Sequence, residues 1–168
     1  MYSKIKLFGH PVHPMLVGFP VAFYTATLAS FIAYNSNHDL FWFKVGYVAN
    51  AAGLIMAALA ALPGFIDWLF IPSTTKAKKT GILHMLCNVA ALALYGANLW
   101  MIKDKWNDAA PSVDTAVWLT GAGFVLTIIA GFLGWALVQK HHVGVDMGKD
   151  PYKRNADNLS TVSGSRSA

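Results

Sequence analysis

The sequence predicts an all-α integral membrane protein, a bundle of four transmembrane helices. Hydrophobic residues make up 55% of the 168 residues, whereas charged residues make up only 12%. A soluble domain carries about 25% charged residues, so this composition argues against a soluble enzyme. Four apolar stretches reach the roughly 20 residues that a helix needs to cross a bilayer core. A disulfide scaffold is excluded, because the single cysteine cannot pair within the chain.

The four predicted spans are separated by short polar connections, which make consecutive helices antiparallel. We therefore expect an up-down-up-down bundle over residues 1–145, followed by a mobile polar tail over residues 146–168. Small residues four apart, such as Gly53 and Ala57, predict close helix packing. No internal repeat is expected beyond the helix hairpins themselves. The spans cover Met15–Tyr34, Val45–Ile71, Ile82–Ile102 and Ala116–Val138.

Basic residues are distributed unequally between the two sides of this bundle. Ten of the 13 Lys and Arg residues fall in the N-terminal segment, the second connection and the tail, which share one side. An excess of Lys and Arg is typical of cytoplasmic segments, so we expect both termini to be cytoplasmic. The net charge of +5 then marks a face that meets anionic lipid, and it requires no nucleic-acid partner.

The N-terminal motif Gly-His-Pro-Val-His-Pro, over Gly9–Pro14, is the most informative segment. Prolines are tolerated in the first turn of a helix, where the N–H groups have no partner. A helix that begins near Pro11 would carry His10 and His13 on one face, three residues apart. Histidines at such a spacing can chelate one metal ion.

Two further polar residues are expected at the same membrane depth. Asp67, the only acid within a span, lies about one turn before the end of the second span, and His84 lies in the first turn of the third. A carboxylate in a helix end usually has a partner or a function. We therefore predict a site for a transition metal ion, zinc or iron, with Asn88 orienting a ligand. Its ligands would be His10, His13, Asp67 and His84.

The same histidines allow a b-type haem, with His13 and His84 on facing helices as its two axial ligands. Glycines would give the macrocycle room, namely Gly18, Gly53, Gly81 and Gly131. Haem needs no carboxylate beside its ligands, so Asp67 favours the bare ion. A third interpretation is a scaffold subunit without catalytic activity, whose histidines only organise the membrane interface. An iron ion or a haem would suit a redox role with a membrane partner protein, and a homo-oligomer is the alternative assembly.

Several of these motifs resemble a known group of bacterial membrane proteins. They are the Gly9–Pro14 segment, Gly64–Trp68, His84-x-x-x-Asn88, and Gly131–Gly134 followed by His142–Val145. In these motifs the chain resembles domain-of-unknown-function family 2231. The resemblance extends from about Phe8 to Val145. The resemblance implies a four-helix domain of the bacterial inner membrane without an established activity. Similar domains are joined to redox proteins or found near them, which would favour electron transfer.

Overall fold

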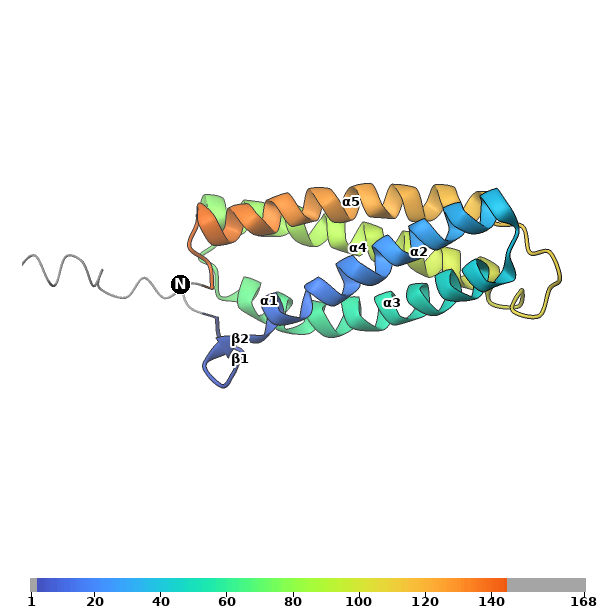
Figure 1. Ribbon diagram of the computed structural model, residues 1–168. Coiled ribbons are helices and arrows are strands. Elements are labelled where there is room, and N and C mark those ends of the chain that lie inside the picture. The colour runs from blue at the N-terminus through green and yellow to red at the C-terminus, as the bar shows by residue number, and fades with distance from the viewer. Residues whose placement is uncertain (1–2, 145–168) are drawn as a thin grey trace, which may run out of the picture.

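The computed structural model describes residues 3–144 as an elongated bundle of helices (Figure 1). Four helical segments of this part of the chain are long and apolar enough to cross a membrane, which confirms the predicted fold class. The tail predicted over residues 146–168 lies outside the described residues. The elements in chain order are β1 (Lys6–Leu7), β2 (His10–Pro11), α1 (Val12–Leu16), α2 (Gly18–Asn37), α3 (Leu40–Leu69), α4 (Lys76–Ile102) and α5 (Asp114–Gln139).

Helices α3 and α4 begin five or six residues before the predicted spans, because polar residues cap them. The Asp39 side chain accepts a hydrogen bond from the backbone N–H of Phe41, and Thr75 accepts one from that of Lys78. Such caps satisfy backbone donors that have no partner within a helix. The first turn of α4 is polar and is passed over by a search for apolar runs, whereas the apolar first turn of α3 is separated from the predicted span by Lys44.

The N-terminal segment forms a short β-hairpin before the first span. Phe8 and Gly9 both have positive φ angles, 49° and 82°, as a tight hairpin turn requires. Strand β2 therefore extends to Pro11, and α1 begins only at Val12. A break separates α1 from α2 near Val17, because Pro20 has no N–H to donate to the carbonyl of Leu16.

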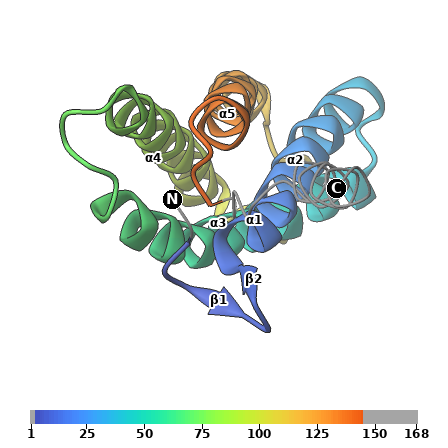
Figure 2. The same ribbon diagram turned by 90° about the vertical axis from the view of Figure 1, so that its left-hand side faces the viewer.

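The four long helices pack as two pairs, α2 against α3 and α4 against α5 (Figure 2). The pairs meet through contacts of α2 with α5 and of α3 with α4. The N-terminal hairpin, the α3–α4 connection and the end of α5 lie at one end of the bundle (Figure 1). We call this the histidine end, because it also contains His13 and His84.

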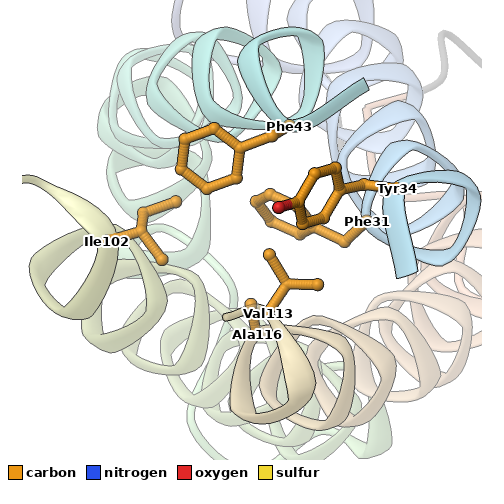
Figure 3. Close-up of a cluster of buried hydrophobic side chains, with 6 residues drawn as sticks. All are labelled: Phe31, Tyr34, Phe43, Ile102, Val113 and Ala116. Carbon is orange, nitrogen blue, oxygen red and sulfur yellow. The ribbon is translucent and has the colours of Figure 1, made fainter. Parts of the chain in front are cut away.

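The opposite end of the bundle is closed by a tight apolar core (Figure 3). Gly46 admits the ring of Phe31 there, since a Cβ atom on Gly46 would lie 2.8 Å from that ring. Many large apolar side chains elsewhere face outward; Trp118 is 80% exposed, as lipid-facing residues are. The core consists of Phe31, Tyr34, Phe43, Ile102, Val113 and Ala116.

Candidate functional site

His13 lies on α1 and is held against α3. Its Nδ1 atom is 2.8 Å from the carbonyl oxygen of Ala60. Because a carbonyl can only accept, Nδ1 carries a proton, and in the neutral ring Nε2 then has the lone pair. The ring fits only beside a glycine, since a Cβ atom on Gly64 would lie 2.6 Å from Nδ1.

His84 lies on α4 and is held against α5 in the same way. Its Nδ1 atom is 2.8 Å from the carbonyl oxygen of Ala130 and therefore donates to it. A Cβ atom on Gly134 would lie 3.1 Å from this ring. The rings of His13 and His84 have centroids 6.2 Å apart and perpendicular planes. The structure thus brings together the two histidines that were predicted to face each other.

The two histidines occupy equivalent positions in the two helix hairpins, the level at which a repeat was expected. His13 and His84 are 71 residues apart, and so are Tyr24 and Tyr95, whose rings stack with centroids 3.7 Å apart. A glycine on the following helix accommodates each of these rings: Gly64 and Gly134 beside the histidines, and Gly53 and Gly123 beside the tyrosines. The α2–α3 and α4–α5 pairs are therefore equivalent halves. Equal His-to-Tyr spacing within each half was the signal available in the sequence.

His10 does not share a helix face with His13, contrary to the prediction. It lies in β2, where its Nδ1 atom is 3.0 Å from the carbonyl oxygen of Phe8. The turn at Phe8 and Gly9 keeps the chain in a hairpin up to Pro11, so His10 precedes the helix.

Asp67 has partners in the N-terminal segment instead of the histidine pair. Its carboxylate accepts hydrogen bonds from the Ser3 hydroxyl at 2.6 Å and the Lys4 backbone N–H at 2.7 Å. It therefore ties the start of the chain to the end of α3. Within residues 3–144, no group of three or more His, Cys, Asp or Glu residues lies close enough to hold a metal ion. The predicted four-ligand set is thus not assembled in the described structure.

Asn88, predicted to orient a metal ligand, lies one turn after His84 on α4 and contacts it. Its amide nitrogen lies 3.2 Å from Nε2 of His84 and 2.8 Å from the carbonyl oxygen of the same residue. The carbonyl oxygen of Ala130 orients the ring through its hydrogen bond with Nδ1. Asn88 instead donates to the one nitrogen of His84 that has a lone pair to offer a ligand.

An apolar groove of about 460 Å³ runs between α2 and α5. Four glycines were expected to make room for a macrocycle. The space beside two of them is already filled, by the ring of Tyr24 at Gly53 and by the ring of Trp68 at Gly81. Gly131 lines the groove, and an added Cβ atom there would meet nothing within 4 Å. The groove is lined by Val21, Thr127, Ile128, Gly131, Phe132 and Trp135.

Comparison with known proteins supports the family that the motifs indicate. A family model described as a predicted membrane protein (DUF2231) matches residues 9–147, which include both histidines and the glycines beside them. No curated protein and no solved structure matches the chain. Because the match covers most of the sequence and the fold has four candidate spans, the chain belongs to this family of predicted membrane proteins.

Proposed function

We propose that the protein is a membrane electron carrier that binds a b-type haem through His13 and His84. The observation that carries this proposal is the 6.2 Å separation of the two imidazole centres. A metal–imidazole bond is about 2.0 Å long, and the ligating nitrogen lies about 1.1 Å from the ring centre. Two axial imidazoles on one iron atom therefore have centres about 6 Å apart, in agreement with this pair.

The hydrogen bonds of the two rings also suit axial ligands. Each Nδ1–H group donates to a helix carbonyl, that of Ala60 or Ala130, which leaves Nε2 as the ligating atom. A histidine that binds a metal nearly always donates its other N–H group in this way, which fixes the ring and raises its basicity. Asn88 would release Nε2 of His84 when a ligand takes that position.

Haem accounts for the number of ligands better than a bare ion does. The pair supplies two nitrogens, whereas a closed zinc site uses four protein ligands. His10 and Asp67, which were expected to complete such a set, bond to Phe8, Ser3 and Lys4. The macrocycle of a haem would supply four nitrogens of its own, so two histidines would be enough to complete the ligands of its iron.

Electron transfer is the activity that this ligation favours. With both axial positions taken by the protein, the iron has no open position for oxygen or a substrate. The distribution of Lys and Arg leads us to place the histidine end at the cytoplasmic face of a bacterial inner membrane. A membrane redox protein would then be the partner.

The visible spectrum of protein purified from haem-replete membranes tests the proposal. We expect a Soret band, a reducible iron and one haem per chain. His13→Ala and His84→Ala should each lose most of the haem, or shift the Soret band to that of five-coordinate iron, because one protein ligand is removed. His38→Ala is the matched control, since His38 is exposed and follows α2 at the opposite end. It should keep the full spectrum.

Elemental analysis of the same preparations separates the other interpretations. A colourless protein with one zinc or iron ion per chain, lost in both histidine variants, would refute haem and favour the ion. A colourless protein without metal would mean that the histidines serve packing alone, as in a scaffold subunit.

A further inference from the structure

A layer of polar side chains crosses the middle of the bundle, which is otherwise apolar there. Each long helix contributes one member, and all four are completely buried. Each is separated by 14 residues of the chain from one of the two histidines or from one of the two glycines beside them, which corresponds to about 21 Å of helix. All four therefore lie at one depth, and we call them the polar layer: Thr27, Asn50, Asn98 and Thr120.

The polar layer follows the internal repeat. Thr27 and Asn98 are 71 residues apart, as the two histidines are, and Asn50 and Thr120 are 70 apart, as the two glycines beside those histidines are. Each half of the protein thus contributes one threonine and one asparagine. The stacked rings of Tyr24 and Tyr95 lie one turn nearer the histidine end.

The threonines of the layer use their hydroxyl hydrogens within their own helices. Thr27 donates to the carbonyl oxygen of Phe23 at 2.8 Å, and Thr120 donates to that of Ala116 at 2.7 Å. Their oxygens keep lone pairs that can accept further hydrogen bonds.

The asparagines retain polar atoms without a partner. Asn50 donates to the carbonyl oxygen of Tyr95, but its side-chain oxygen has no hydrogen bond within the described part of the chain. Neither the amide nitrogen nor the amide oxygen of Asn98 has one either. The same is true of the Tyr24 hydroxyl, whereas the equivalent Tyr95 hydroxyl donates to the carbonyl oxygen of Thr120 at 3.1 Å. Unsatisfied donors and acceptors thus occur together at one depth.

Such atoms need a partner that the surrounding bilayer cannot supply. A buried polar group without a hydrogen bond costs free energy comparable with a lost hydrogen bond, and hydrocarbon offers no donor or acceptor. Water fills this role in protein interiors, where each molecule typically bonds to two to four polar groups. The amides and hydroxyls here are neutral and include both donors and acceptors, which suits water better than an ion.

We propose that the polar layer binds water, which bridges Asn50, Asn98 and the Tyr24 hydroxyl. The repeat supports this placement, because Tyr24 and Asn50 correspond to Tyr95 and Thr120, which are joined by a direct hydrogen bond. This hydrated layer lies about 21 Å of helix away from the histidines and does not depend on the presence of haem.

Radiolytic hydroxyl labelling tests for this water, because a brief X-ray pulse generates radicals from water wherever it is bound. Tyr24 and Tyr95 are the reporters, at 4% and 0% exposure. Phe31 and Phe43, both 0% exposed in the apolar core, are aromatic controls with matched burial. We expect both tyrosines to be labelled by the pulse and both phenylalanines to stay unlabelled.

The variant Asn98→Leu keeps the number and branching of the side-chain heavy atoms and removes the amide with two unpartnered atoms. It should abolish labelling of Tyr24 while the exposed Trp100 stays labelled. If this variant does not fold, the comparison of tyrosines with phenylalanines in the unaltered protein decides alone. Unlabelled tyrosines, or tyrosines labelled no faster than Phe31 and Phe43, would overturn the proposal.

Discussion

The substitution Gly64→Ala tests whether His13 is confined to the position that ligation requires. The added Cβ atom would lie 2.6 Å from Nδ1 and 2.7 Å from Cε1 of the ring, whereas ordinary contact begins at 3.4 Å. The ring must therefore retreat by the 0.8 Å between 2.6 and 3.4 Å. That movement lengthens the 2.8 Å hydrogen bond to Ala60 past the usual limit of about 3.2 Å.

Three free-energy terms set the size of the effect. Overpacking at a tight contact costs about 1–3 kcal/mol, and losing the hydrogen bond costs about 1 kcal/mol. Alanine in place of glycine returns about 1 kcal/mol through helix propensity. The net destabilisation is about 1–3 kcal/mol, and each kcal/mol lowers the melting temperature by about 2–4 °C for a chain of this size. Haem affinity should fall about 10–100-fold, as when a partner that orients a metal ligand is lost.

Thermal unfolding in detergent and haem content per chain measure the two effects. Gly96→Ala on α4 is the matched control, because its Cβ atom would meet nothing within 4 Å. That variant should keep its haem and gain up to about 1 kcal/mol. If Gly64→Ala melted like the unaltered protein and retained full haem, Gly64 would not confine the ring and the geometric argument would fail.

Three further substitutions or fusions address packing, the N-terminal segment and orientation. Gly53→Leu should cost about 1–3 kcal/mol or more, because a Cβ atom there already lies 2.8 Å from the ring of Tyr24; an unchanged melting curve would contradict this. Asp67→Asn should leave haem in place but expose the N-terminal segment to proteolysis, since the carboxylate that accepts from Ser3 and Lys4 is gone. Loss of haem in this variant would count against the proposed ligation. A reporter fused after Ala168 should be cytoplasmic, and a periplasmic signal would reverse the orientation.

The fold class could be predicted from the sequence because lipid imposes a simple requirement. Each helix must present about 20 apolar residues, and that requirement is visible in hydropathy. The helix starts were less accessible, because α4 begins with a polar turn capped by Thr75, and the start of α3, capped by Asp39, is separated from the rest of its span by Lys44. The hairpin before α1 depends on positive φ angles at Phe8 and Gly9. The sequence does not reveal it, because the two prolines of the motif suggest the start of a helix instead.

The candidate site was predictable only in part. His13 and His84 could be brought together by topology alone, because helix direction places both at one end of the bundle. The partners of His10 and Asp67 could not be predicted, because they depend on where residues 3–11 fold back. A carboxylate near a helix end predicts a partner, but its spacing from three histidines does not say which partner it meets.

The internal repeat leaves only a weak signal in the sequence, because most positions in a membrane helix face lipid. Those positions need only be apolar, so the two halves diverge freely there, and the shared residues are the ones in contact. Each half keeps a histidine, a tyrosine 11 residues later, and a glycine beside each ring. The two halves contribute equivalent imidazoles, each held by its own helix carbonyl. A flat ligand with two like faces, as haem is, therefore suits this site better than an ion that needs four converging side chains.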